Sequence, residues 1–169
     1  KPVEREEQEY CFDCSKRSFH YTRGYPCIKY DKTMSKSISS FKYKGKREYA
    51  TFYVNEILNM YEELLRAERF DLLIPIPIHY SKYRERGFNQ AELIAQGIGK
   101  RIQVTVDTKV LIRNRKTLPQ KQLNEKERLK NLEQAFEVVK RNLTTNYKKI
   151  LLVDDIYTTG STIEACAKL

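Results

Sequence analysis

Residues 150–162 read ILLVDDIYTTGST. The first four, from Ile150 to Val153, are apolar and mostly branched, as in a strand of a parallel sheet that is buried on both faces. Asp154 and Asp155 are too polar to continue such a strand. They are therefore expected at its carboxyl end, where open α/β sheets bind ligands. The stretch predicts an α/β fold with a ligand site at that edge of the sheet.

A loop suited to phosphate follows the two acids, and it consists of Thr158, Thr159, Gly160, Ser161 and Thr162. Gly160 tolerates the backbone geometry of a tight turn, and the hydroxyls offer hydrogen bonds and an N-cap to a helix from Ile163 onward. Such a loop directs backbone N–H groups and the positive end of a helix dipole at one point. With two carboxylates beside it for ribose hydroxyls, the loop predicts a sugar phosphate as ligand.

These same residues resemble the phosphoribosyl-pyrophosphate (PRPP) motif of type I phosphoribosyltransferases. That motif consists of an apolar strand, an acidic pair, two variable residues and Thr-Thr-Gly-X-Thr. The resemblance implies that Asp154, Asp155 and residues 158–162 bind PRPP together with Mg²⁺, with the acids on the ribose hydroxyls and helping to order the metal. An ordinary strand-to-helix turn is the alternative.

Composition narrows the class of protein. The chain has 169 residues, 40% of them hydrophobic and 32% charged, which indicates a globular protein about the size of one domain with a highly charged surface. Neither a run of about 18 apolar residues nor a signal peptide pattern occurs, so we expect a cytoplasmic protein that is not itself transmembrane. The net charge of +10 and the pI near 9.4 favour anionic partners, whether PRPP, nucleic acid or both. A basic surface without such a partner is the alternative.

The first two of the four cysteines, Cys11 and Cys14, form a CxxC pair that could bind one metal ion. A closed zinc site needs four ligands, and three interpretations remain open. The pair is half of a zinc ribbon whose other half precedes the chain, or it shares an ion with Cys27, with or without His20, or its thiols are free. We expect the first, with Zn²⁺ held in part by Cys11 and Cys14. Cys166 is expected to be a small core residue.

The first half of the chain predicts a short strand over 25–30 and helices over 32–43 and 47–68. The first helix ends in Phe41-Lys-Tyr-Lys-Gly-Lys46, where aromatic and basic residues alternate. Such a stretch suits contact with nucleic acid, in which rings stack on bases and amines meet phosphates. The end of an ordinary amphipathic helix is the alternative.

A second ligand segment is predicted at residues 79–90, which read HYSKYRERGFNQ and follow a strand over 71–78. A helix capped by Asn89 comes next. Because this basic loop also lies between the carboxyl end of a strand and the start of a helix, it should face the same crevice as Asp154 and Asp155. Lys82, Arg84 and Arg86 could then contact pyrophosphate or DNA. A loop that is merely solvated is the alternative.

The remaining region predicts one or two strands within 104–112, a helix over 124–135, and strands over 136–139 and 149–153. Between them, residues 113–123 contain Arg113, Arg115 and Lys116. This cationic segment could order over bound pyrophosphate and exclude water, or it could reach DNA.

Several phrases together resemble the ComF family of competence-associated proteins. They are Pro-Ile-Pro-Ile-His at 75–79, Arg-Glu-Arg-Gly-Phe-Asn-Gln at 84–90, Phe-Lys-Tyr-Lys-Gly at 41–45, and Arg113, Thr117, Gln120, Arg128, Asn131 and Phe136. The resemblance runs from Cys11 to Leu169. It implies a zinc-ribbon segment within 1–31 and a type I phosphoribosyltransferase fold over 32–169, in which a Rossmann-like parallel sheet is flanked by helices. A parallel sheet normally continues past such a last helix, so we expect this domain to extend beyond Leu169. One CxxC pair stands where the family usually has two.

The resemblance further implies a role in uptake of single-stranded DNA into the cytoplasm during natural transformation. PRPP, single-stranded DNA and the uptake machinery at the inner membrane, its helicase or pore, are then the expected partners. The alternative is an active phosphoribosyltransferase that releases pyrophosphate. Purine-salvage relatives commonly carry an Asp at the position of Thr158, so neither a general base nor an acceptor is predicted here. The absence of that acid slightly favours PRPP binding with little turnover.

Overall fold

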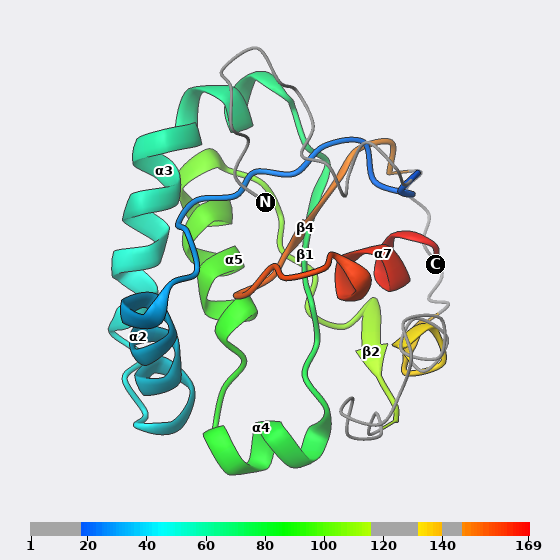
Figure 1. Cartoon of the computed structure of the whole chain (residues 1–169). Coiled ribbons are helices and arrows are strands. Elements are labelled where there is room, and N and C mark those ends of the chain that lie inside the picture. The colour runs from blue at the N-terminus through cyan, green and yellow to red at the C-terminus, as the bar shows by residue number, and fades with distance from the viewer. Residues whose placement is uncertain (1–17, 116–131, 140–146) are drawn as a thin grey trace.

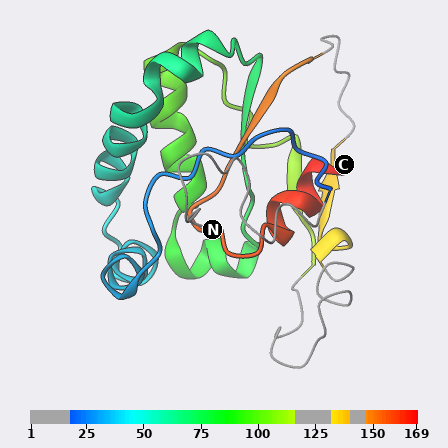
Figure 2. The ribbon, with the colours of Figure 1, turned by 45° about the horizontal axis from the view of Figure 1, so that its top comes forward.

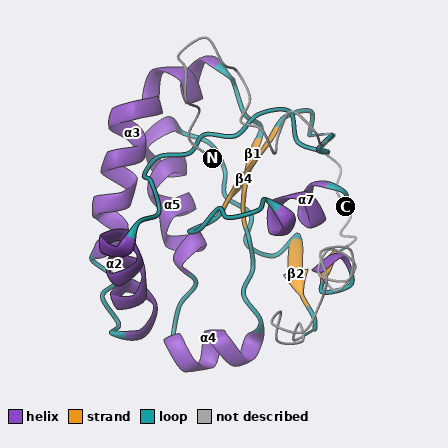
Figure 3. Ribbon diagram, viewed as in Figure 1, coloured by secondary structure: helices purple, strands orange, loops and turns teal. Residues whose placement is uncertain are grey.

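The computed structural model describes residues 18–115, 132–139 and 147–169 (Figures 1 and 3). Its helices are α2 (Lys32–Tyr43), α3 (Tyr49–Ala67), α4 (Tyr80–Arg86), α5 (Gln90–Ile102) and α7 (Ser161–Ala167). Its strands are β1 (Leu72–Pro75), β2 (Leu111–Arg113), β3 (Phe136–Val138) and β4 (Ile150–Val153).

The sheet that carries the predicted site is parallel. β1 and β4 pair with Leu72 opposite Ile150 and Pro75 opposite Val153. The Ile76 N–H extends the ladder by donating to the Val153 carbonyl over 2.8 Å. On the other side of β1, Leu73 forms a parallel bridge with Val106. β2 and β3 pair separately in antiparallel fashion. The predicted α/β class with a parallel sheet is therefore confirmed.

The sheet is covered on both faces because successive side chains of a strand point to opposite sides. Leu73 and Val153 pack with residues of α2, α3 and α5. Leu72 and Ile74 pack in a second cluster with Cys166 of α7 and with β2 and β3. Figure 2 shows α3 and α5 on one side of the strands and α7 on the other. Cys166 is a buried core residue, as predicted.

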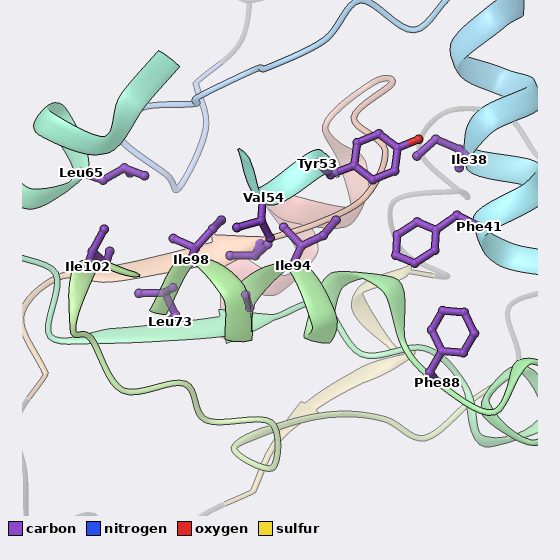
Figure 4. Packing of buried hydrophobic residues seen from close by; sticks show 12 residues of the cluster. Ile38, Phe41, Tyr53, Val54, Leu65, Leu73, Phe88, Ile94, Ile98 and Ile102 are labelled. Carbon is purple, nitrogen blue, oxygen red and sulfur yellow. The ribbon is translucent and has the colours of Figure 1, made fainter. Parts of the chain in front are cut away.

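The larger cluster brings α3 and α5 close together (Figure 4). A Cβ at Gly97 of α5 would lie 2.6 Å from a methyl carbon of Val54 on α3, so only glycine permits this approach. Phe41 of α2 and Leu73 of β1 are both 0% exposed. The closely packed pair of α3 and α5 therefore covers one face of β1 and β4.

Two expectations about strands are corrected. Residues 25–30 form no strand: Tyr25 packs edge-on against Tyr61 and Phe70, and the Tyr61 hydroxyl donates to the Pro26 carbonyl over 2.7 Å. These side chains gain burial against α3 without a backbone ladder, which the composition of the segment could not reveal. β4 is a strand, but only Val153 is buried and Ile150 is 43% exposed. The fully buried strand is β1.

The predicted basic loop over 79–90 is also corrected, because residues 80–86 form helix α4. The His79 side chain accepts from the Ser81 N–H at the N-cap, and Gly87 ends the helix with φ of 76°. Asn89 caps α5 through the Ala91 N–H, as predicted. The helices expected over 32–43 and 47–68 are confirmed.

Some predictions fall largely outside the described residues: the loop over 113–123 beyond Arg115, and the helix over 124–135 before Leu132. Within 18–115, 132–139 and 147–169, every helix is too short or too polar to pass through a lipid bilayer.

Candidate sugar-phosphate site

The two acids lie where the sequence predicts, directly after β4 and at the edge where β1 also ends. Asp154 Oδ1 accepts a hydrogen bond from the Asp155 N–H over 2.8 Å. Asp155 Oδ2 lies 2.7 Å from Nζ of Lys42, which comes from the last turn of α2. The Lys42 and Asp155 side chains are only 16% and 13% exposed.

Burial and the neighbouring Asp155 charge raise the pKa of Asp154 to about 7, and the Lys42 charge acts in the opposite direction. Two adjacent carboxylates resist simultaneous ionisation when they are partly removed from water. Near neutral pH the pair therefore holds a proton for part of the time. A ligand that donates hydrogen bonds to both carboxylates would favour the fully ionised form.

The loop after the acids has the predicted geometry at Gly160, which has φ of +78° and is buried. Thr158 and Thr159 are exposed, and the Thr159 and Ser161 hydroxyls lie 2.8 Å apart. The helix begins at Ser161, earlier than predicted, and its N-cap is Gly160 without a side-chain hydrogen bond. The expected hydroxyl cap on Ile163 is thus wrong, because the left-handed glycine already turns the chain into the helix.

Backbone donors remain available on this loop. Among the described residues, the N–H groups of Thr158, Thr159, Gly160 and Thr162 donate to no acceptor. Orphan N–H groups at the first turn of a helix are the donors that bind anions. Four such donors within five residues, beside two carboxylates, can accommodate a phosphate next to a hydroxyl-bearing group.

The segment 18–31 contacts this loop, which the sequence did not suggest. A Cβ on Gly160 would lie 2.5 Å from the Tyr157 hydroxyl, so the Tyr157 ring covers that residue. The Tyr157 hydroxyl lies 2.8 Å from the Tyr21 hydroxyl. His20 binds the buried Glu164 of α7 twice, through its N–H at 2.9 Å and through Nδ1 at 2.5 Å. Figure 1 shows the segment crossing the sheet between α7 and α2.

The predicted cations of α4 are only partly brought to the site. Lys82 pairs with Glu85 of its own helix over 2.7 Å, and the Arg84 guanidinium lies 5.9 Å from the centre of the Tyr80 ring. In the described part of the chain, neither cation contacts Asp154 or Asp155. α4 does lie beyond the carboxyl end of β1, as Figure 1 shows.

Arg86 is placed differently from the other two cations. Its guanidinium donates to Gln90 Oε1 over 3.1 Å and to the Tyr43 hydroxyl over 3.2 Å, and it lies over the Tyr43 ring. Tyr43 follows Lys42 in the chain, so Arg86 joins α4 to the helix end that reaches Asp155.

Arg113, at the end of β2, lies over the Phe136 ring and within electrostatic reach of Asp154. Burial lowers the pKa of the Arg113 guanidinium, and the charges of Cys166 and Asp154 oppose that shift. Burial also raises the pKa of the Cys166 thiol to about 12, so this cysteine is not a thiolate nucleophile at neutral pH. Arg115 is exposed, and Lys116 lies outside the described residues.

The predicted zinc ligands Cys11 and Cys14 also lie outside the described residues. Among the residues that are described, no group of three or more His, Cys, Asp and Glu side chains could hold a metal ion. His20 contacts Glu164 of α7, whereas Cys27 Sγ lies 3.6 Å from Met60 Sδ of α3. His20 and Cys27 thus contact different helices. All three interpretations of the CxxC pair stay predictions.

Lys42 lies at the candidate site, where the sequence did not place it. It belongs to the alternating stretch of rings and amines that suggested contact with nucleic acid. Phe41 is fully buried, and the next residue along the helix turns toward Asp155. The helical period alone could indicate that one residue of the stretch faces inward, but not which distant carboxylate it would meet.

Named relatives align along most of the chain. Competence protein F of Haemophilus influenzae is 27% identical over 95% of this chain and 72% of its own length. The DNA utilization protein YhgH of Escherichia coli K12 is 27% identical over 94% of this chain and 70% of its own. Competence protein ComFC of Bacillus subtilis is 29% identical over 82% and 54%, respectively.

No family model and no solved structure matches the chain. The named relatives nevertheless agree with the resemblance carried by residues 41–45, 75–79 and 84–90. The chain is thus similar over most of its length to proteins named for competence and DNA utilization, in keeping with its resemblance to the ComF family.

Proposed function

We propose that the chain is a PRPP-binding, phosphoribosyltransferase-like protein that acts in DNA uptake during natural transformation. The names of the relatives support the role in competence and DNA use. The observation that carries PRPP binding is the placement of two carboxylates and four unused N–H donors within nine residues at the carboxyl edge of a parallel sheet. That edge is where open α/β sheets bind nucleotides and sugar phosphates.

In the proposed complex, the 5′-phosphate accepts from the N–H groups of residues 158–162, assisted by the Thr159 and Ser161 hydroxyls. The ribose hydroxyls donate to Asp154 and Asp155. Because the pKa of Asp154 is raised to about 7, ligand binding at neutral pH releases part of a proton from this carboxyl. Arg113 and Arg86 are the described cations best placed to favour an anionic ligand beside the acids, since each is linked to Asp154 or to the Lys42 helix end.

Mg²⁺ would accompany PRPP, whose pyrophosphate oxygens are ligands of the kind that this ion prefers. Asp154 and Asp155 supply oxygen donors of the same class, so the residues present fit a magnesium complex of the substrate. When bound, the ion neutralises charge on the pyrophosphate group. The zinc ribbon that includes Cys11 and Cys14 belongs to the proposal as well, as does a location in the cytoplasm.

The alternative function is transfer of phosphoribose to an unidentified acceptor. In that reaction the bond from ribose C1 to pyrophosphate breaks, and a bond from C1 to the acceptor forms. The residue at the position where purine-salvage relatives carry an acid is Thr158, and it is exposed and cannot take a proton from an acceptor. This feature favours binding with little or no turnover, and measured pyrophosphate release would separate the two functions.

Single-stranded DNA is the second ligand that we propose, and the surface of α4 supports it. Tyr80 and Tyr83 are 68% and 45% exposed, and Tyr43 at the end of α2 is 59% exposed. Lys82 and Arg84 lie beside them on α4. Exposed rings interspersed with cations suit stacking on bases and contact with phosphates, independent of sequence.

The decisive test is calorimetric titration of PRPP with Mg²⁺ into the protein and into an Asp154→Asn, Asp155→Asn double variant. We expect heat of binding from the protein and none from the variant, because neutral amides are weaker acceptors for ribose hydroxyls than carboxylates. Glu63→Gln removes an exposed carboxylate on α3 and serves as the control that should bind normally. Absence of binding by the unaltered protein at about 10⁻³ M PRPP, the weak end of specific affinity, would reject the proposal.

A further inference from the structure

The ion pair between Lys42 and Asp155 differs from the other ion pairs of the described residues in its burial. Both of its side chains are less than one-fifth exposed, at 16% and 13%. In the Lys82–Glu85 pair both partners are about half exposed, at 48% and 49%. In the Arg101–Glu62 pair the arginine side chain is 63% exposed. Exposed pairs contribute little to folding, whereas a shielded pair holds its two groups in one geometry.

The helix end that bears Lys42 is held rigidly. Phe41 is 0% exposed, with its ring centre 5.6 Å from that of Tyr53 and 5.7 Å from that of Phe88. Arg47 donates to the Gly87 carbonyl over 2.9 Å and lies over the Phe88 ring. The chain on either side of Lys42 therefore contacts the turn between α4 and α5, through Phe41 and Arg47. These contacts hold the end of α2 in the position from which Lys42 reaches Asp155.

The ammonium group of Lys42 lies close enough to Asp155 to offset part of the repulsion between the two carboxylates. Two neighbouring carboxylates repel each other. A nearby cation offsets part of this repulsion. Lys42 Nζ approaches Asp155 at Oδ2, so it orients the carboxylate while the other oxygen, Oδ1, is not taken by this contact. One oriented acceptor is what a single ribose hydroxyl requires.

We propose that Lys42 is a positioning residue, which orients the Asp155 carboxylate toward one hydroxyl of a ribose 5-phosphate and thereby selects ribose over deoxyribose. Helix α2 is then part of the sugar-phosphate site, although it precedes β1 in the chain and contains no part of the PRPP motif. The inference rests on the proposed function, because it assigns to Asp155 the ribose hydroxyls of PRPP.

The test compares the affinities of ribose 5-phosphate and of its analogues that lack the 2-hydroxyl or the 3-hydroxyl. The variants are Lys42→Met, which keeps the length of the side chain without its charge, and Lys42→Arg, which keeps the charge. Lys44→Met removes an exposed cation from the same helix end and is the matched control. Circular dichroism and melting temperature establish folding, and Lys42→Gln replaces Lys42→Met if the latter is unfolded.

We expect Lys42→Met to lose about tenfold in affinity for ribose 5-phosphate, the size of one hydrogen bond to a charged group. Its affinity for one deoxy analogue, the one that lacks the hydroxyl held by Asp155, should fall much less. The preference for ribose over that analogue therefore drops toward one. Lys42→Arg should retain most of the preference, and Lys44→Met should leave it unchanged.

An equal loss for all three sugars would overturn the inference, since a general effect on folding or charge lowers every affinity alike. Unchanged binding by Lys42→Met would overturn it too. A loss for PRPP without a loss for ribose 5-phosphate would instead make Lys42 a pyrophosphate contact. Failure of the proposed function is recognised separately, because the unaltered protein would then bind neither PRPP nor ribose 5-phosphate.

Discussion

The segments that follow β1 and β4 start at the same edge of the sheet, but they use their polar groups differently. After β4, residues 154–162 keep four backbone donors free and hold two partly buried carboxylates. After β1, residues 80–86 form α4, where Lys82 pairs with Glu85 and Arg84 lies near Tyr80. Two segments at the same edge of the sheet thus differ in how far their charged side chains are already paired within the protein. The adjacent, partly buried carboxylates distinguish the first segment from the second.

Two glycines with the same backbone geometry offer the strongest way to test that difference. Gly160 has φ of +78° and Gly87 has φ of +76°. Replacement by Ala should destabilise the fold by about 1–2 kcal/mol at each position, because an L-residue is strained there. At Gly160 the new Cβ also meets the Tyr157 hydroxyl at 2.5 Å, whereas at Gly87 the nearest atom is Arg47 Nη2 at 3.3 Å.

We therefore expect Gly160→Ala to lose PRPP affinity by more than about tenfold, the cost of misplacing one or two hydrogen bonds. Gly87→Ala should keep that affinity at temperatures where it is folded. Titration calorimetry combined with thermal melting measures both quantities. If the two variants lose affinity equally, the distinction between the segments is wrong.

The acidic pair predicts a pH dependence of stability that α4 should not share. Because the folded-state pKa of Asp154 is about 7 and the ordinary value is 3.8, the unfolded chain ionises first as pH rises. Stability is then lost between about pH 4 and pH 7, by on the order of 1.4 kcal/mol for each unit of pKa difference that persists in solution. Asp154→Asn should remove this loss and be more stable than the parent above pH 7.

Urea unfolding from pH 4 to pH 8 measures this effect, with Glu63→Gln as a control whose curve should follow the parent. Parent and Asp154→Asn curves that run parallel over this range would show that burial does not hold a proton on Asp154.

The exposed tyrosine rings of α4 should contribute to the binding of single-stranded DNA and not to the binding of PRPP. Tyr80→Ala and Tyr83→Ala should each weaken binding of single-stranded DNA by about 1 kcal/mol, the lower value for stacking of one base. Lys82→Ala should reduce the dependence of DNA affinity on salt by about one phosphate contact. Fluorescence anisotropy at several salt concentrations tests these variants, and PRPP titration provides the control. If these variants also lost affinity for PRPP, residues 79–90 and 154–162 would belong to one binding site.

The smallest effect concerns the hydroxyl contact that links the segment 18–31 to the loop. Tyr157→Phe and Tyr21→Phe should each lower stability by about 0.5 kcal/mol, since the hydrogen bond of 2.8 Å between the two hydroxyls is exposed. The double variant should lose no more than either single one, because both changes remove the same bond. Additive losses in denaturant titration would mean that the hydroxyls act independently.

Local sequence patterns were sufficient to predict much of the backbone around the candidate site. The polarity switch from Val153 to Asp154 located the end of β4, and Gly160 marked the left-handed turn before α7. The helix spanning Gln90–Ile102 and its Asn89 cap followed from periodicity and cap chemistry. Each of these features depends on interactions between residues close in the chain. The prediction of a strand over 25–30 was wrong, because aromatic residues also pack well in segments that form no backbone hydrogen bonds to a neighbouring strand.

The sequence by itself determined the α/β class, the edge at which the acids lie and the geometry of the loop after them, since strand burial, polarity and glycine act locally. Only the tertiary structure decided that Lys42 meets Asp155, that Arg86 binds Tyr43, and that His20 and Tyr21 contact the residues around the loop. These contacts join segments more than forty residues apart. Their geometry depends on how α2, α3 and α5 pack against one face of the sheet, and no single stretch of the chain encodes that packing.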